Sequence, residues 1–327
     1  MRAALKTFML GLLLFAAPAG AQESLQQANA RLFDQLKKVH RLSASEVQTL
    51  REIFERSGYI GQGNPRITRH PMTPEQCHAR IPGGPESYAS ARNARICGDK
   101  YMAPLYDPRT QKPGDAKACI DQFEFPNIPC TYPVVWTKAA EAAQICAAVG
   151  KRLCDAHEWE GACAGALEPP DYFFGLGSVA AMRNAHNAKY AKTKSWSYGP
   201  AYEKGVCAAA SHKSASCSGG GGFNSCGSNT YPTGSFPGCK SALGVYDIHG
   251  NAAEHMNLPM APSQMASAGS RKLGVTEMKG SWFIFDRYYA HPDWCRWRAP
   301  YWHGSKVMSP ASHANYHLGF RCCKTID

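Results

Sequence analysis

Two carboxylates flank a tight turn in the C-terminal half of the chain and could bind a hard cation. Asp247 and Glu254 lie at the two ends of the segment Asp247-Ile-His-Gly-Asn-Ala-Ala-Glu254, around a Gly-Asn pair. Calcium prefers oxygen ligands, and a tight turn exposes backbone carbonyls between such carboxylates. The alternative is a metal-free turn stabilised by Asx-type hydrogen bonds. We predict a calcium site here.

Fourteen cysteines form the second set of reactive residues, and all of them lie between Cys77 and Cys323. No Cys-x-x-Cys pair occurs, so the thiolate spacing of zinc ribbons and thioredoxin-like sites is missing. The N-terminus reads as an export signal, because Arg2 and Lys6 precede a short apolar stretch and small residues end at Ala21. An even number of cysteines in an exported chain indicates disulfides. We therefore predict cleavage near Ala21 and a periplasmic or secreted protein.

The third set is aromatic and lies in a short stretch near the C-terminus. Rigid amphipathic rings hold peptides or sugars with little loss of entropy, so this stretch is a candidate recognition groove. We expect at least half of the rings to fill the core instead. The aromatic residues of the stretch are Trp282, Phe283, Phe285, Tyr288, Tyr289, Trp294, Trp297, Tyr301 and Trp302, and Asp286, Arg287, Arg296 and Arg298 are interleaved with them.

Four histidines accompany the aromatic stretch, namely His291, His303, His313 and His317. The last two are four residues apart, which on a helical turn is a spacing that can hold iron or zinc. The segment 309–316 has a loop-like composition, however, and no carboxylate is near in sequence. Solvated or hydrogen-bonded histidines are the simpler interpretation.

The overall composition excludes several classes of protein. The chain has 36 Lys and Arg against 25 Asp and Glu, and the basic residues form no run of five, which argues against nucleic-acid binding. No apolar segment is long enough to span a bilayer. The sequence leaves the oligomeric state open.

The elements that position these residues are short. Residues 23–58 predict an amphipathic helical hairpin, with Ser43 and Glu46 as a capping box. Residues 58–113 and 165–243 are rich in Gly, Pro, Ser and Asn and predict loops held by disulfides. A strand is expected after Cys119, a helix capped by Thr137 up to about Val149, and a second helix capped by Asp155.

An ordered set of motifs in residues 117–323 resembles the sulfatase-modifying-factor family, whose type member is the formylglycine-generating enzyme. The resemblance rests on the segments Pro133-Val-Val-Trp-Thr-Lys, Gly150-Lys-Arg-Leu-Cys-Asp-Ala-His-Glu-Trp-Glu, Thr233-Gly-Ser-Phe-Pro, Gly244-Val-Tyr-Asp-Ile-His-Gly-Asn-Ala-Ala-Glu, Lys279-Gly-Ser-Trp and Leu318-Gly-Phe-Arg-Cys. It implies an α+β fold of the C-type-lectin-like kind, rich in loops and disulfides. Family positions imply the bridges Cys146–Cys322 and Cys163–Cys295. Cys154 and Cys323 sit beside the first bridge, so we predict that they pair with each other; free buried thiols are the alternative.

The same resemblance bears on metals. In the family the predicted calcium loop binds through positions that match Asp247, the Gly250 and Ala252 carbonyls, and Glu254. The type member oxidises a substrate cysteine with two thiols that bind copper. Counted from Ser281, those positions here hold Ile284 and Tyr289, so the copper site of the type member is not expected.

We therefore predict an exported, calcium-stabilised member of this family that recognises a peptide or glycan through a groove at Ser281, Trp282, Tyr289, Trp294 and Arg298. The alternative is an oxidoreductase that uses non-haem iron to tailor a secreted peptide or siderophore. Iron-dependent relatives of this fold take ligands from a His-x3-His-x-Glu motif that this chain lacks, and a purely structural envelope protein is a third option. The predicted organisation is a signal peptide at 1–21, a helical hairpin at 22–60, a Cys-containing loop region at 61–116 and the family domain at 117–327.

Overall fold

A computed structural model of the chain describes residues 23–218, 221–288, 293–298, 309–311 and 313–326. The predicted signal peptide lies outside the described residues. The helices are α1 (Leu25–His40), α2 (Ala44–Ser57), α3 (Pro74–Arg80), α4 (Ala91–Cys97), α5 (Ala139–Ala148), α6 (Ala156–Ala164), α7 (Val179–Tyr190) and α8 (Phe285–Tyr288). The strands are β1 (Met102–Leu105), β2 (Ala118–Asp121), β3 (Arg152–Leu153), β4 (Ala253–Leu258), β5 (Val275–Lys279), β6 (Leu318–Gly319) and β7 (Cys322–Thr325).

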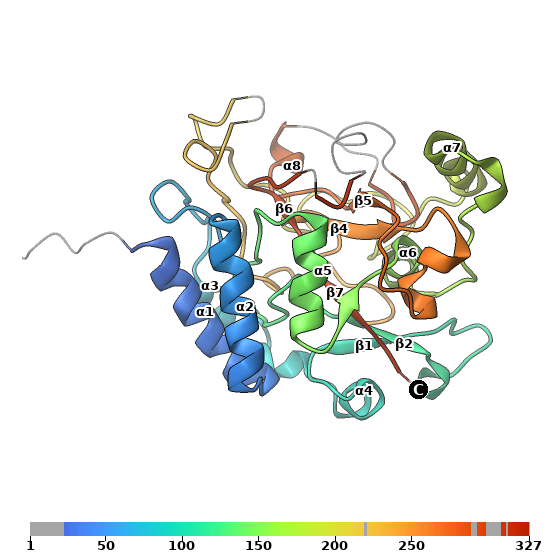
Figure 1. The fold of residues 1–327 in the computed structure, drawn as a ribbon, viewed down its shortest axis with the longest axis horizontal. Coiled ribbons are helices and arrows are strands. Elements are labelled where there is room, and N and C mark those ends of the chain that lie inside the picture. The colour runs from blue at the N-terminus through green and yellow to red at the C-terminus, as the bar shows by residue number, and fades with distance from the viewer. Residues whose placement is uncertain (1–22, 219–220, 289–292, 299–308, 312, 327) are drawn as a thin grey trace, which may run out of the picture.

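The strands form two small sheets. The first has the order β1-β2-β7-β3 with antiparallel neighbours, and the second has the order β5-β4-β6, in which β4 and β6 are parallel. The C-terminal segment joins the two sheets because β6 and β7 are separated by only two residues, Phe320 and Arg321. Both of these side chains are fully buried. The result is an α+β fold in which most of the chain is loop (Figure 1).

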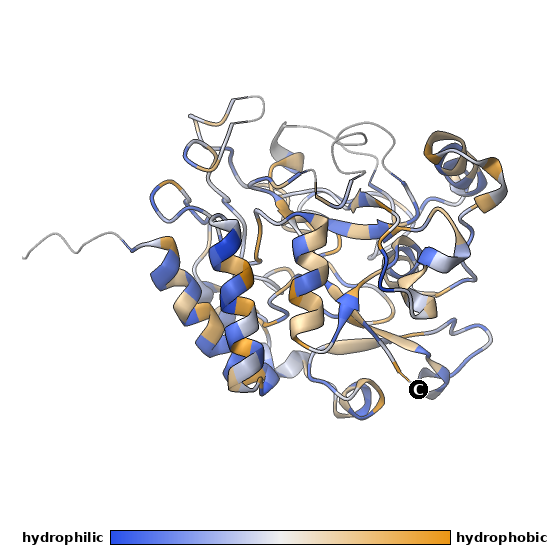
Figure 2. Ribbon diagram, viewed as in Figure 1, coloured by the Kyte–Doolittle hydropathy of each residue, from blue (hydrophilic) through white to orange (hydrophobic). Residues whose placement is uncertain are grey.

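The N-terminal helices form the predicted hairpin and pack against the domain through α5 (Figure 1). Ser24 caps α1 together with Gln27, and Ser43 caps α2 together with Glu46, as the sequence predicts for the second helix. Figure 2 shows hydrophilic and hydrophobic residues alternating along both helices, whereas α5 is largely apolar. The apolar faces meet in one core, in which each fully buried large side chain, such as Leu36, stabilises the fold by about 1.5–3 kcal/mol.

Three expectations about local structure are wrong. The region 61–116 contains α3, α4 and β1 rather than loops alone, because Thr73 and Ser90 cap short helices that the bridges Cys77–Cys130 and Cys97–Cys119 tie to the domain. The region 165–243 contains α7, which Ser178 caps. The cap of α5 is Lys138 rather than Thr137, whose hydroxyl donates instead to the Leu318 carbonyl.

Seven disulfides account for all fourteen cysteines, so the chain has no free cysteine. The structure contains the pairs that the resemblance implies, Cys146–Cys322 and Cys163–Cys295, and also the pair Cys154–Cys323. The remaining bridges are Cys77–Cys130, Cys97–Cys119, Cys207–Cys239 and Cys217–Cys226. Among the described residues, no helix is long and apolar enough to cross a membrane.

Candidate functional site

The predicted calcium loop is a turn that leads into β4 and is shaped by left-handed backbone. Asp247, Gly250 and Asn251 all have positive φ. A Cβ at Gly250 would lie 2.7 Å from the Ala208 carbonyl oxygen, so only glycine fits there. The turn therefore holds a fixed shape, and it brings the Asp247 carboxylate back toward the start of β4.

The two predicted carboxylate ligands of calcium differ in their surroundings. One oxygen of Asp247 accepts a hydrogen bond from the Gly234 amide at 2.6 Å, and its Oδ1 has no hydrogen-bond partner within the described part of the chain. Glu254, by contrast, accepts from Arg321 at 2.6 and 2.7 Å and from the Trp159 indole at 3.0 Å. Asp247 therefore has an oxygen to offer a cation, whereas the Glu254 carboxylate already pairs with the Arg321 guanidinium.

A third buried carboxylate, Glu124, lies against this turn and has no counterpart in the sequence prediction. Its oxygens accept from the Ala252 amide and from the Asn251 side chain, both at 2.6 Å. Burial and the neighbouring carboxylates of Asp247 and Glu254 raise the pKa of Glu124 well above its usual value. Burial also raises the pKa of Asp247 to about 7. Asp247, Glu124 and Glu254 thus face a single cationic side chain, Arg321. The excess of negative charge favours binding of a further cation or a proton at this turn.

The positions of the family's copper-binding thiols hold no thiolate. Ile284 is buried in an apolar cluster with Trp282 and Phe283, and Tyr289 lies outside the described residues. Every cysteine of the chain is in a disulfide. The two-thiolate copper chemistry of the type member therefore has no ligands in this oxidised form of the chain.

The described members of the predicted groove are buried rather than exposed to a ligand. The Ser281 hydroxyl accepts from the Gly250 amide, and the Trp282 ring stacks on His317 with centroids 3.9 Å apart. Trp294 packs against Trp297. Arg298 is fully buried. More than half of the nine rings thus belong to the core, as expected, because five of them, Trp282, Phe283, Phe285, Trp294 and Trp297, are buried.

Arg298 belongs to a buried charge network. It contacts Glu160 at 2.9 Å and Asp171 at 3.6 Å, and Lys279 contacts the same Glu160. His186 faces both carboxylates, at 3.4 and 3.1 Å. Glu160, Asp171 and His186 have the donor atoms of a metal site, but the cations beside them already neutralise the carboxylates. Within the described residues, the protein's own cations therefore occupy the places around these carboxylates that a metal would take.

The histidines of the aromatic stretch are not brought together with carboxylates in the part of the structure that is described. His317 is buried against Trp282, and His313 is half-buried on a loop. His291 and His303 lie outside the described residues. The described histidines therefore give no specific support to an iron site.

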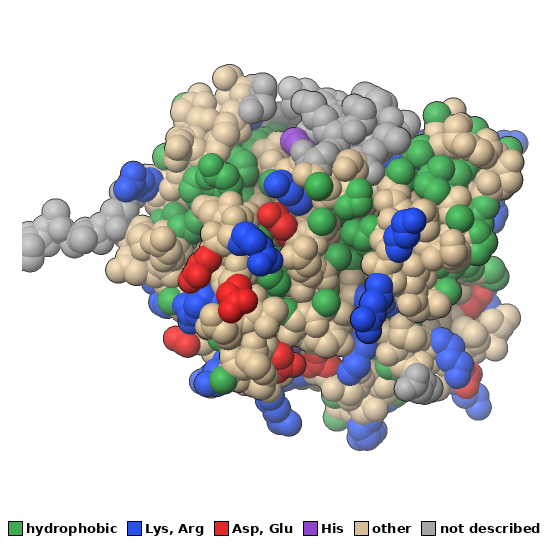
Figure 3. Space-filling model, viewed as in Figure 1, with side chains coloured by type: hydrophobic (Ala, Val, Ile, Leu, Met, Phe, Trp, Pro, Cys, Tyr) green, Lys and Arg blue, Asp and Glu red, His purple; other side chains and the backbone are tan. Residues whose placement is uncertain are grey.

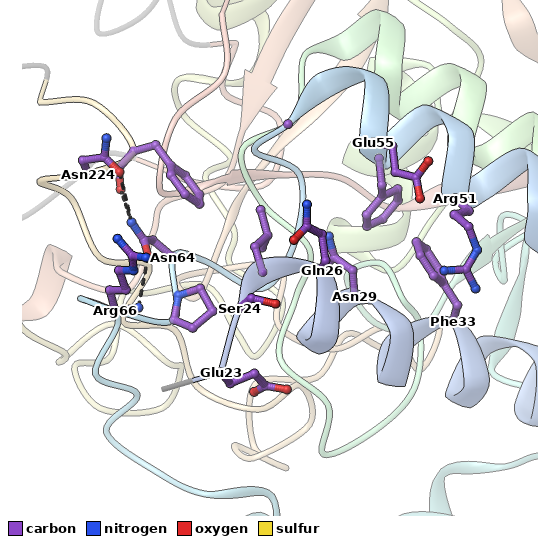
Figure 4. Close-up of a pocket in the computed structure, with 15 residues that line it drawn as sticks. Glu23, Ser24, Gln26, Asn29, Phe33, Arg51, Glu55, Asn64, Arg66 and Asn224 are labelled. Carbon is purple, nitrogen blue, oxygen red and sulfur yellow. Dashed lines mark hydrogen bonds between the residues drawn. The ribbon is translucent and has the colours of Figure 1, made fainter. Parts of the chain in front are cut away.

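An open cavity lies elsewhere, between the N-terminal hairpin and two loops (Figure 4). Its volume is about 330 Å³, and the residues that line it include Phe33 and Phe54 from the hairpin and Phe223 from the loop that Cys217–Cys226 closes. Amides and charges surround these rings, namely Gln26, Asn29, Asn64, Asn224, Arg51, Arg66, Glu23 and Glu55. No sequence motif marks this cavity, because its walls come from segments that are far apart along the chain.

The walls of this cavity are held in place by hydrogen bonds. Asn64 donates to the Phe223 carbonyl at 3.0 Å and accepts from the Arg66 amide at 3.0 Å, as Figure 4 shows at one end of the cavity. Asn29 donates to the Ile60 carbonyl at 2.9 Å, and its buried Oδ1 has no hydrogen-bond partner among the described residues. A preformed cavity lined by rings and amides is typical of a small-ligand or side-chain binding site.

One protein family matches most of this chain. The model of the sulfatase-modifying factor enzyme 1-like domain matches residues 105–326, and the chain belongs to this family. The crystal structure of CarF is similar at 14% identity, with a TM-score of 0.35 over 70% of this chain and 98% of CarF. The U1 variant of the Major Tropism Determinant is similar at 11% identity, with a TM-score of 0.30 over 69% of this chain and 55% of that protein. No curated protein matches the chain.

Proposed function

We propose that this family member is an exported recognition module that binds a peptide or glycan in the cavity beside the N-terminal hairpin. The observation that carries the proposal is the lining of that cavity, in which the half-buried Phe223 ring is surrounded by amides and by charges of both signs. Rings supply apolar contact at low entropic cost, and amides supply directional hydrogen bonds to hydroxyl or peptide groups. This cavity replaces the Trp282 region as the proposed binding surface, because its wall includes the half-buried Phe223 ring, whereas the described rings of the Trp282 region are buried.

The disulfides support export, and the distribution of surface charge argues against a nucleic-acid partner. Seven disulfides require an oxidising compartment to form and persist. On the face shown in Figure 3, basic side chains are spread over the surface rather than gathered into one patch, so this face does not resemble a nucleic-acid-binding surface. N-terminal sequencing of the secreted or periplasmic protein tests the export signal. The expected mature chain begins close after Ala21.

Calcium is proposed as a stabilising ion at the Asp247 turn. The Asp247 oxygen that lacks a hydrogen-bond partner among the described residues and the excess of buried carboxylates support it. The proposed ligands are Asp247, the Gly250 and Ala252 carbonyls, and Glu254, which also pairs with Arg321. Elemental analysis of the purified exported protein is the direct measurement. Calcium alone supports recognition, whereas stoichiometric iron or copper would overturn it in favour of an oxidoreductase.

The binding proposal is tested with glycan and peptide arrays, followed by titration of the strongest probe. Phe223→Ala is the informative variant, because Phe223 is half-buried in a loop and contributes a cavity wall. Loss of an aromatic contact in a binding pocket should weaken binding by about 10-fold or more. Phe174→Ala is the matched control, since Phe174 is equally half-buried but packs on Tyr172 away from the cavity. Equal affinity of the two variants would contradict the assignment.

A further inference from the structure

An exposed aromatic ring lies beside the cavity of the N-terminal hairpin. Helix α2 ends at Ser57, and Gly58 has a left-handed conformation with φ of 76°, which ends the helix just before Tyr59. Tyr59 is 52% exposed, and its ring centroid lies 5.1 Å from that of Phe223 at an interplanar angle of 47°. Rings tilted in this way leave part of each face uncovered. Because Phe223 lines the cavity, the two rings continue the cavity wall to the surface.

This pair of rings has a rigid support. The buried Trp136 ring meets the Phe223 ring edge-on, with centroids 5.4 Å apart. The Asn64 side chain donates to the Phe223 carbonyl at 3.0 Å, and the bridge Cys217–Cys226 closes the loop that carries Phe223. A preformed aromatic surface binds a ligand with a small loss of conformational entropy. The ring pair is therefore ready to receive a flat apolar face.

A cationic side chain next to the ring pair is available to an anion. Arg66 is exposed, and its amide donates to the Asn64 side chain at 3.0 Å, which fixes its backbone beside the anchor of Phe223. The Arg69 guanidinium donates to the Arg66 carbonyl at 3.1 Å, so a second cation lies close by. Among the described residues, the Arg66 guanidinium forms no ion pair with a carboxylate.

The two carboxylates of the cavity do not neutralise this cationic end. Glu23 accepts a hydrogen bond from Arg31 of α1 at 2.8 Å. Glu55 lies with Arg51 at the end of the cavity opposite Arg66, as Figure 4 shows, and it follows Arg51 by four residues, or one turn of α2. An anionic group near Arg66 therefore meets an excess of positive charge.

The lining favours a sugar over a peptide. None of the described residues that line the cavity lies in a strand, so a peptide backbone finds no strand edge to pair with. Phe33 and Phe54, which could enclose an apolar side chain, are buried, and the accessible ring surface is that of Tyr59 and Phe223. The C–H groups on one face of a sugar ring pack against such a surface, and sugar hydroxyls suit exposed amides such as that of Asn224.

Given the recognition role proposed above, on which this assignment rests, we propose that the cavity binds a glycan that contains hexuronate residues. The sugar ring packs on Tyr59 and Phe223, its carboxylate pairs with the Arg66 guanidinium, and a hydroxyl bonds to the Asn224 amide. Guanidinium and carboxylate are both planar and match each other through two parallel hydrogen bonds. Arg66 thereby distinguishes an acidic sugar from a neutral sugar of the same shape.

The test uses calorimetric titration of the full mature protein with its disulfides intact. The probes are tetramers of galacturonic, glucuronic and mannuronic acid, each paired with its methyl ester, which has the same ring without the charge. At least one acid should bind about 10-fold or more tightly than its ester, and this preference should weaken as salt is added. In Arg66→Gln the preference should disappear while the affinity for the ester stays within about 2-fold. Arg92→Gln, which changes an exposed arginine of α4, is the matched control and should keep the preference.

The ring contact has its own pair of variants. Tyr59→Ala should weaken the binding of acid and ester alike, by about 2–10-fold, because it removes a ring that both sugars contact. Tyr202→Ala is the control, since Tyr202 is also exposed but packs on Trp196. Equal losses in these two variants would remove Tyr59 from the site and overturn the assignment.

The remaining outcomes separate this assignment from the recognition role on which it rests. Acid and ester that bind equally, or an Arg66→Gln protein that keeps the preference, would overturn the hexuronate assignment and leave recognition in place. Binding of a glutamate-rich peptide instead of every sugar would do the same. Failure of all sugars and peptides to bind would overturn both.

Discussion

Arg298 provides a sharp test of the structural reasoning, because the sequence places it in a ligand groove and the structure buries it. Its guanidinium contacts Glu160 through Nε at 2.9 Å and Nη2 at 3.3 Å, and it lies over the Tyr172 ring at 4.7 Å. In Arg298→Met an apolar side chain of similar length replaces the arginine, and among the described residues Glu160 keeps Lys279 and the His186 imidazole beside it. Removal of one partner of a buried pair costs about 3–5 kcal/mol, and we expect the lower end because Lys279 remains.

The pH dependence of this loss follows from the pKa of Glu160. Burial alone would raise that pKa, but Arg298, His186 and Lys279 together hold it well below its usual value. Stability from a carboxylate with a lowered pKa is fully present above the ordinary pKa of about 4.5 and is lost as the pH falls below it. Without Arg298 the pKa of Glu160 rises, so acid unfolding should begin at a higher pH.

The assay is urea unfolding of the purified disulfide-bonded protein, at neutral pH and across the acid range. Arg109→Met is the control, since Arg109 pairs with Asp107 on the surface and its loss should change the free energy of unfolding by less than about 1 kcal/mol. The double variant Glu160→Gln with Arg298→Met should recover part of the loss, because no buried charge is left unpaired. The reasoning is refuted if Arg298→Met destabilises no more than Arg109→Met does.

Three further predictions concern other sites. In Asp247→Ala, calcium should no longer raise the melting temperature above its value in EDTA, and an unchanged response would remove the calcium site. In the protein that retains Asp247, the rise should be larger at pH 8 than at pH 6, because burial raises the pKa of Asp247 to about 7. Burial lowers the pKa of His70 to about 4, so up to about 3 kcal/mol of stability that is present above pH 6.5 is lost as the pH falls to 4. In His70→Gln, the free energy of unfolding should therefore depend less on pH between 6.5 and 4. Replacing Cys154 and Cys323 by Ala should lower the free energy of unfolding in urea by about 2–4 kcal/mol, since their bridge spans 169 residues. An unchanged free energy of unfolding would show that the neighbouring bridge Cys146–Cys322 already supplies the whole cross-linking effect.

Much of the local structure could be predicted from the sequence because its causes are local. Ser43 and Glu46 form the capping box of α2, and Asp155 is the N-cap of α6. The short helices α3 and α7 were missed since their seven and twelve residues lie among Gly, Pro and Ser, where composition predicts loops. Their caps, Thr73 and Ser178, were the available signal.

Pairing partners could be predicted only where a family pattern supplied long-range information. Cys146 and Cys322 are 176 residues apart, and nothing local to either cysteine specifies the other. The same holds for Glu124, which reaches the Asp247 turn across more than a hundred residues of chain. A strand-like alternation around Glu124 predicts burial but not the carboxylates that it meets.

The sequence by itself determined the family, the α+β fold, the helical hairpin and the loss of both copper-binding thiols, because each depends on residue types at fixed spacing. Only the tertiary structure decided which side chains meet. It buried Arg298 and Trp282, which sequence had assigned to a groove, and it opened a cavity at Phe223. It also set the exposed Tyr59 ring beside Phe223. The physical reason is that burial and contact depend on how distant segments pack, and in a fold made mostly of loops no helical or strand period reports that packing.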